Sequence, residues 1–201
     1  CYLMDHQKVF STNIFIKDNY TTPDRINTMR REVMNLYKEK PNWQSSPNLD
    51  KNEVFKDFNK DISKSSFEIL DKLDYKADEI EITDMWANVL KQHETHQPHT
   101  HSNNFLSGVF YLDADDTMPG ITFQDPRPGA NVILPRKKFD HMNNANLLNY
   151  KAKTNRIIIF PSWLVHWVPT NLSTSNRISI SWNIQIRGQL GEHHEFQSGQ
   201  F

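Results

Sequence analysis

Residues 177–186 read Arg-Ile-Ser-Ile-Ser-Trp-Asn-Ile-Gln-Ile, a stretch in which polar and apolar side chains alternate strictly. Because successive side chains of a β-strand point to opposite faces, this alternation predicts a strand with one apolar and one polar face. A uniformly polar face is often a solvated sheet edge. Here, however, the polar face begins with Arg177 and Ser179, which together can bind a carboxylate through a charge-assisted contact and a hydroxyl hydrogen bond.

Further strands are indicated upstream of this stretch, where the same two-residue period begins at Ile80. Glycine and proline residues separate the runs, which is typical of the irregular connections of a β-sandwich or barrel. We therefore expect the C-terminal two-thirds of the chain to be β structure, with strands over residues 80–90, 105–112, 121–124, 156–160, 164–169 and 177–186.

Two amphipathic helices are expected before the strands. The first has Thr22 as its cap and Pro23 in its first turn, and Pro41 is expected to end it. The second is expected to start near Asn52, where apolar residues recur at helical spacing and the opposite face is rich in Lys and Asp. Both are predicted to support the sheet without taking part in chemistry.

The length of the chain, 201 residues, fits one domain, and its 37% hydrophobic and 11% aromatic residues suffice for a core. We expect a single domain over residues 1–201. Within it, residues 1–79 are expected to form a support region of strand and helices, residues 80–187 the β core, and residues 188–201 a tail.

The charge balance indicates neither a nucleic acid nor a membrane partner, because 23 Lys plus Arg oppose 24 Asp plus Glu. The sequence has neither a run of 18 apolar residues nor a secretion-signal pattern at its start. Its single cysteine, Cys1, cannot form an intramolecular disulfide or hold a zinc or iron-sulfur centre alone. These features predict a reducing, cytoplasmic location.

The histidines suggest a metal site. His99 and His101 are two residues apart, so on an extended strand both imidazoles point to the same face, as adjacent metal ligands must. His166 lies within the apolar stretch Leu-Val-His-Trp-Val and needs a partner for its ring nitrogens. Taken singly, each histidine is more simply a loop or core residue, but together they predict a centre of three ligands.

Five motifs follow one another along the chain. In order they are His-x-His (99–101), Phe-Leu-Ser-Gly-Val-Phe-Tyr-Leu (105–112), Phe-Gln-Asp-Pro-Arg (123–127), Phe-Pro-Ser-Trp-Leu-Val-His (160–166) and Asn-Arg-Ile-Ser-Ile-Ser-Trp-Asn (176–183). With these motifs the chain resembles, over roughly residues 80–187, 2-oxoglutarate-Fe(II) oxygenases related to the prolyl 4-hydroxylase type. The resemblance implies a double-stranded β-helix, of the jelly-roll or cupin-like kind, that holds Fe(II) by two histidines and a carboxylate beside 2-oxoglutarate.

The same resemblance assigns roles to individual residues. His166 matches the distal metal histidine, and Arg177 matches the arginine that binds the distal carboxylate of 2-oxoglutarate. Ser179 resembles the serine of the family's Arg-x-Ser pair, and Tyr111 resembles a tyrosine that hydrogen-bonds the same carboxylate. Asn88, which shares a strand face with Ile80 and Ile82, is a candidate to line the pocket near the cofactor.

The chain departs from the family where His-x-Asp or His-x-Glu is expected, because it has His99-Thr-His101. Three interpretations remain open: a centre of His99, His101 and His166, a two-histidine centre completed by a carboxylate such as Asp125, or a site with an open position. We favour the first, because the same-face spacing of the two histidines requires no further assumption.

The function that follows is oxidation of a substrate by O2, coupled to oxidative decarboxylation of 2-oxoglutarate. The resemblance implies a hydroxylase of a protein side chain, of the prolyl type, or of a small molecule. Two alternatives are an oxoglutarate-independent, three-histidine dioxygenase of the cupin type and a non-enzymatic β-sandwich module. Residues 131–150 are expected to be either a flap over the barrel mouth or a surface insertion. The sequence predicts neither the substrate nor the oligomeric state.

Overall fold

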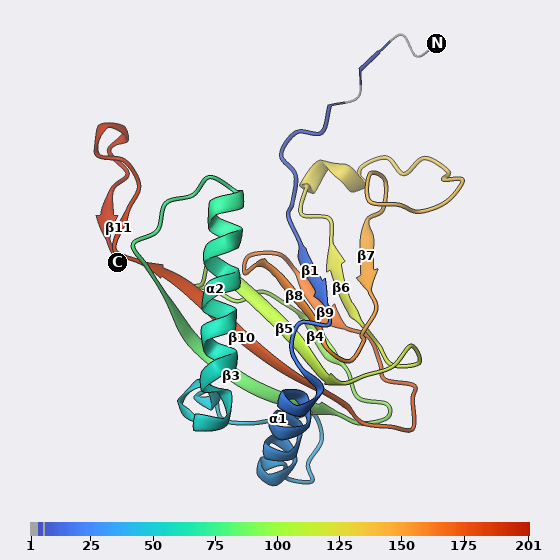
Figure 1. Cartoon of the computed structure of the whole chain (residues 1–201). Coiled ribbons are helices and arrows are strands. Elements are labelled where there is room, and N and C mark those ends of the chain that lie inside the picture. The colour runs from blue at the N-terminus through green and yellow to red at the C-terminus, as the bar shows by residue number, and fades with distance from the viewer. Residues whose placement is uncertain (1–3, 6) are drawn as a thin grey trace.

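Two antiparallel sheets face each other in the computed structural model, which describes residues 4, 5 and 7–201 (Figure 1). The larger sheet has the strand order β1 (Phe15–Asp18), β8 (Arg156–Pro161), β5 (Leu106–Asp113), β10 (Arg177–Arg187), β3 (Glu79–Leu90) and β2 (Trp43–Gln44). The smaller sheet has the order β4 (His96–His99), β9 (His166–Val168), β6 (Ile121–Gln124) and β7 (Leu147–Tyr150). Cys1 lies outside the described residues.

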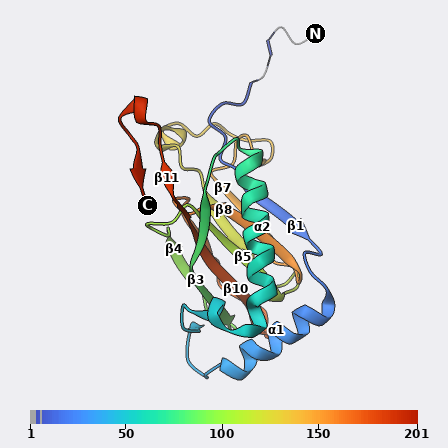
Figure 2. The ribbon, with the colours of Figure 1, turned by 60° about the vertical axis from the view of Figure 1, so that its left-hand side comes forward.

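Two helices cover one face of the larger sheet, α1 (Pro23–Leu36) and α2 (Lys56–Lys72), as Figure 2 shows. Helix α1 begins as predicted, since the Thr22 side chain accepts a hydrogen bond from the Arg25 N–H. It ends at Leu36, before Pro41 is reached. The second helix starts later than predicted, because Asn52 caps a short 3-10 turn, η2 (Glu53–Phe55), that precedes it.

The remaining elements are short. The 3-10 turn η1 (Leu49–Lys51) precedes η2, and η3 (Pro128–Asn131) lies in the connection between β6 and β7. The C-terminal residues, predicted as a tail, include a hairpin of β11 (Gln189–Leu190) and β12 (Gly199–Gln200) with η4 (His193–Glu195) between its strands. In the part of the chain that the structure describes, no helix combines the length and apolar character needed to cross a membrane.

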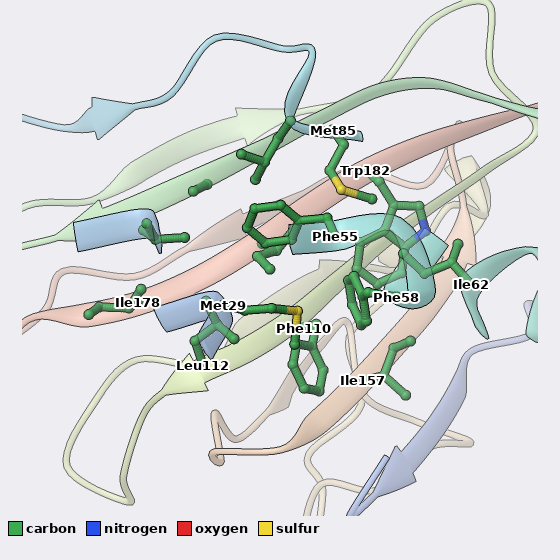
Figure 3. Packing of buried hydrophobic residues seen from close by; sticks show 14 of the residues in the cluster. Met29, Phe55, Phe58, Ile62, Met85, Phe110, Leu112, Ile157, Ile178 and Trp182 are labelled. Carbon is green, nitrogen blue, oxygen red and sulfur yellow. The ribbon is translucent and has the colours of Figure 1, made fainter. Parts of the chain in front are cut away.

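The apolar face of β10 packs against the helices. Ile180, Trp182 and Ile184 are fully buried in a core that also contains Phe58 and Ile62 of α2 (Figure 3). The rings of Phe58 and Trp182 meet edge to face with their centroids 5.8 Å apart. The helices therefore act as the predicted supporting layer.

The polar face of β10 is directed into the space between the two sheets, so the strand is not a solvated edge. Strand β10 lies between β5 and β3, and its Arg177, Ser179 and Asn183 side chains are buried. A second apolar cluster fills the other part of this space, and it includes Val109, Tyr111, Ile121, Phe123, Ile158, Phe160 and Leu164. The β core is therefore buried on both faces of its central strand.

The six strands predicted from the two-residue period are all present. The period did not reveal β1, β4 or β7, which are four residues long each, or the two-residue β2. Residues 131–150 end in β7 and are otherwise a long connection at the end of the smaller sheet. The division of the chain into three regions of one domain stays a prediction.

A glycine beneath Trp182 should be required for this packing. A Cβ atom added to Gly108 would lie 2.2 Å from Cζ2 of Trp182, whereas one added to Gly129 would meet nothing within 4 Å. We expect Gly108→Ala to lower the free energy of unfolding by about 1–3 kcal/mol through overpacking. Gly129→Ala, the matched control, should change it by less than about 0.5 kcal/mol. Urea unfolding followed by tryptophan fluorescence measures both, and equal stabilities would contradict the packing described.

Candidate metal and co-substrate site

Three histidines converge at one end of the space between the sheets. One ligand nitrogen from each of His99, His101 and His166 lies within 4.8 Å of the others. His99, the last residue of β4, is paired with His166, the first residue of β9. His101 follows β4 by two residues, and its backbone N–H donates to the Ser162 carbonyl at 2.9 Å. The cluster therefore forms where β4 ends, beside the start of the neighbouring strand β9.

Hydrogen bonds fix the ring nitrogens of two of these histidines. Nδ1 of His99 lies 2.7 Å from the Gln97 carbonyl, and Nδ1 of His166 lies 2.8 Å from the Leu164 carbonyl. Because a carbonyl oxygen can only accept, each Nδ1 carries a hydrogen in these contacts. In the neutral form of either ring, this leaves Nε2 with a free lone pair, as in a metal-ligating histidine whose other nitrogen donates to a carbonyl.

Burial keeps two of the imidazoles in the neutral form that binds a metal ion. It lowers the pKa of His166 to about 3, and the hydrogen bond to Leu164 opposes this only in part. Burial also lowers the pKa of His101 to about 4. Both side chains are therefore uncharged at neutral pH, so metal binding would not have to displace a proton from either.

The cluster forms one wall of a cavity of about 420 Å³ that reaches from the histidines to Arg177. Exposed Gln44 and Gln97, from the edge strands β2 and β4, lie at its rim. Phe160 and Val168 contribute apolar walls. Arg177, Ser179 and Ser181, from the polar face of β10, line another side of the cavity.

Arg177 lies in this cavity as a buried cation, with 1% of its surface exposed. Its Nη1 donates to the Ser179 hydroxyl at 3.3 Å, and its Cζ lies 4.8 Å from the centre of the Tyr111 ring. Among the described residues, neither Nε of Arg177 nor the Tyr111 hydroxyl has a hydrogen-bond partner. A buried guanidinium with free donors is costly without an anion, so these residues fit a carboxylate ligand.

Asn88 also lines the cavity, but its amide already has two partners. Its oxygen accepts from Gln44 Nε2 at 2.9 Å, and its nitrogen donates to the Ser181 hydroxyl at 3.1 Å. The three side chains form a neutral, hydrogen-bonded row along one wall. Asn88 therefore lines the predicted pocket, but its hydrogen bonds go to Gln44 and Ser181 and not to Arg177.

Asp125 lies outside the histidine cluster. Its two carboxylate oxygens accept from Nε and Nη2 of Arg127 at 3.0 and 2.7 Å. This hydrogen bonding holds the pKa of the Asp125 carboxyl below its usual value. The structure therefore brings the three histidines together and leaves Asp125 in an ion pair with its neighbour.

The polar lining of the cavity also includes residues that the sequence did not predict as site residues, among them His96, Ser181 and Gln44. His96 lines it beside Arg177, and burial lowers its pKa to about 4, with the charge of Arg177 acting in the same direction. Its place three residues before His99 was a signal that the sequence contained. Ser181 was visible on the polar face of 177–186, whereas Gln44 gave no signal, because its strand is only two residues long.

Residues 84–183 match a family described as "Putative 2OG-Fe(II) oxygenase", a span from β3 to β10 that contains the three histidines and Arg177. The chain belongs to the 2OG-Fe(II) oxygenase family. Fe(II) and 2-oxoglutarate are the cofactors of this family, as its name states. The family match therefore confirms the two cofactors predicted from the sequence. No curated protein matches the chain.

Several solved structures share the fold of this oxygenase. The α-ketoglutarate-dependent epimerase SnoN from nogalamycin biosynthesis is 10% identical, with a TM-score of 0.67 over 88% of this chain and 77% of that one. A prolyl-4-hydroxylase from Pseudomonas putida is 11% identical, with a TM-score of 0.62 over 89% and 95%. The collagen prolyl hydroxylase of Paramecium Bursaria Chlorella virus-1 is 13% identical, with a TM-score of 0.58 over 86% and 95%. The predicted double-stranded β-helix is confirmed.

The buried histidines should make the metal-free oxygenase sensitive to acid. In the unfolded chain a histidine takes up a proton near pH 6.5, whereas folded His166 does so only near pH 3. The free energy of unfolding is therefore unaffected by the protonation of His166 above pH 6.5. As the pH falls from 6.5 toward the folded pKa, protonation of the unfolded chain lowers it by about 1.4 kcal/mol per pH unit. We expect His166→Asn to reduce the slope of unfolding free energy against pH between 6.5 and 4, measured with EDTA present. Exposed His194→Asn is the control, and an unchanged slope in His166→Asn would refute the account.

Proposed function

We propose that this oxygenase is an Fe(II)- and 2-oxoglutarate-dependent dioxygenase that hydroxylates its substrate. In this proposal His99, His101 and His166 bind the metal, and Arg177 binds the distal carboxylate of 2-oxoglutarate. One observation carries it: a buried guanidinium that has no carboxylate partner among the described residues shares a cavity with three clustered imidazoles. A dicarboxylate that also chelates a metal ion is the ligand that suits both ends of such a cavity.

The three-histidine centre is favoured over a centre with a carboxylate. The ligand nitrogens of the histidines already lie within 4.8 Å of one another, whereas both Asp125 oxygens are held by Arg127. His101 stands where the wider superfamily has its acid. Three neutral imidazoles leave the metal more positive than two imidazoles and a carboxylate do, and this changes the redox tuning of the iron.

The residues around Arg177 orient the co-substrate. The planar guanidinium can bind a carboxylate through two parallel hydrogen bonds, and the Tyr111 hydroxyl is free to donate a third. Ser179 holds Nη1 of Arg177 in place from two residues along the same strand. Asn88, fixed between Gln44 and Ser181, lines the path between Arg177 and the histidines.

The remaining walls of the cavity are apolar. Val109, Ile121, Phe160 and Val168 enclose it with apolar side chains from both sheets. When bound, Fe(II) supplies activation of O2 and the oxidative decarboxylation of 2-oxoglutarate to succinate and CO2. The protein contributes the ligands, the orientation of the co-substrate and a site with restricted access to solvent.

Hydroxylation of a protein side chain, of the prolyl type, or of a small molecule is the proposed outcome. Two of the structurally similar proteins are named prolyl hydroxylases, although a third is named an epimerase. A second candidate is an oxoglutarate-independent dioxygenase of the cupin type, which the ligand set of three histidines favours. In that case Arg177 would bind a carboxylate of the substrate.

The two candidates differ in their use of 2-oxoglutarate. We expect anaerobic titration of the Fe(II)-loaded protein with 2-oxoglutarate to produce the weak visible charge-transfer band of a metal chelate. Arg177→Ala should need at least tenfold more 2-oxoglutarate, because it removes a charge-assisted contact. The matched control is Arg187→Ala, at the other end of β10, where the arginine pairs with Glu81 at 2.6 Å outside the cavity.

The outcomes separate the candidates. Bound iron without a band would reject oxoglutarate chelation and favour the cupin-type dioxygenase. A protein that binds no Fe(II) would reject both and favour the non-enzymatic module. Equal shifts for Arg177→Ala and Arg187→Ala would refute the role proposed for Arg177.

The third metal ligand is tested by a pair of substitutions. We expect His101→Ala to weaken Fe(II) binding by at least tenfold, because only two imidazoles remain. Asp125→Asn should leave the affinity within about twofold, since this carboxylate is paired with Arg127. Isothermal titration with Fe(II) under argon measures both affinities. Loss of affinity in Asp125→Asn with none in His101→Ala would favour the two-histidine, one-carboxylate centre.

A further inference from the structure

His101 is held differently from its two neighbours in the cluster. The imidazoles of His99 and His166 are each anchored by Nδ1 to the carbonyl two residues before them. Within the described part of the chain, no hydrogen bond is recorded for the His101 ring, which instead faces the Trp86 ring at a centroid distance of 5.6 Å. What fixes His101 is its backbone N–H, which donates to the Ser162 carbonyl at 2.9 Å.

Ser162, the residue after β8, is the end of a chain of buried polar side chains that continues onto β5 and β10 of the larger sheet. Its hydroxyl lies 2.8 Å from the hydroxyl of Ser107, which in turn donates to Oδ1 of Asn183 at 2.8 Å. The exposed fractions of Ser162, Ser107 and Asn183 are 0%, 1% and 5%. Ser162 also donates its backbone N–H to the Phe105 carbonyl, so its main chain is tied on both sides.

The other end of this chain also returns to His101. Nδ2 of Asn183 lies 3.5 Å from Oδ2 of Asp84, which is opposite Asn183 on the neighbouring strand β3. Asp84 also shares a face of β3 with Trp86, two residues further along, whose ring lies 5.6 Å from the His101 ring. One end of the chain thus holds the backbone of His101, and the other places a carboxylate on the strand face that meets its imidazole.

We propose that Asp84, Asn183, Ser107 and Ser162 are positioning residues that hold His101 for metal binding. This inference rests on the proposed function, in which His101 is a metal ligand. Buried hydroxyl and amide groups destabilise a core unless each has a hydrogen-bond partner. A hydrogen-bonded row of such groups, where apolar side chains could pack instead, is therefore expected to hold a particular part of the structure in place. Here the row supplies the anchoring that the His101 ring lacks and the other two rings possess.

Asp84 also compensates for the missing carboxylate of the metal centre. Three neutral imidazoles bring no negative charge to a divalent ion, whereas the superfamily's usual acid would bring one. Asp84 is half-buried on the larger sheet and supplies that charge from outside the ligand set. Residues beyond the ligands of a metal site typically change its metal affinity by about 10- to 100-fold when they are removed.

The test is the binding of Co(II) to the whole chain. Titration calorimetry measures the affinity, and the visible absorption of the bound ion reports its surroundings. We expect Ser107→Ala, which breaks the row in its middle, and Asp84→Asn, which keeps its shape but removes the charge, each to weaken Co(II) binding about tenfold. The absorption bands should change, because His101 is no longer fixed. Asp84 is only half-buried, so Asp84→Asn should fold and still tests the inference if Ser107→Ala does not fold.

The matched control is Ser66→Ala. Ser66 is a fully buried serine of α2 whose hydroxyl donates to the Ile62 carbonyl at 2.9 Å, so the same atom is removed away from the cavity. Its Co(II) affinity should equal that of the wild type even if its melting temperature falls. The inference is overturned if Asp84→Asn and a folded Ser107→Ala bind Co(II) as the wild type does, or if Ser66→Ala loses as much affinity. A wild-type chain that binds no Co(II) would overturn the proposed function itself, and the inference with it.

Discussion

Strand β10 is buried on both faces, yet only one of those faces is apolar, and the architecture of the molecule follows from this. The apolar face requires a hydrophobic cover, which α1 and α2 provide. The polar face requires partners for Arg177, Ser179 and Asn183, because these side chains are buried between the sheets. The smaller sheet closes that space, and it carries two of the three clustered histidines on its paired strands β4 and β9.

The buried polar groups between the sheets fall into two kinds. Ser107, Ser162 and Asn183 satisfy one another, so their hydrogen bonds are complete within the chain. Arg177 and Tyr111 retain donors without a partner in the part of the chain that the structure describes, and burial holds His166 uncharged. The first kind ties neighbouring strands together, whereas the second supplies groups that we propose bind 2-oxoglutarate and the metal ion. A pre-formed site of this sort is possible because the double-stranded β-helix fixes both kinds from several strands at once.

Much of the fold could be read from the sequence, because the long strands near the centre have a clear period. The alternation in 177–186 predicted both faces of β10, and the same two-residue period predicted β3, β5 and β8. The positions of β1, β2, β4 and β7 could not be predicted, since four residues or fewer carry too little periodicity. Helix α2 began later than predicted, because an Asn that resembles a helix cap serves a 3-10 turn instead.

The sequence by itself determined which chemical groups the molecule has: three histidines with ligand spacing, an Arg-x-Ser pair on a polar strand face, and motifs in the order of an oxygenase family. Only the tertiary structure decided which of them meet. His99 and His166 are 67 positions apart in the chain, yet they are paired across two strands, whereas Asp125 pairs with Arg127. Such contacts depend on strand register and on which face each strand buries, and neither is encoded in the local periodicity of any one segment.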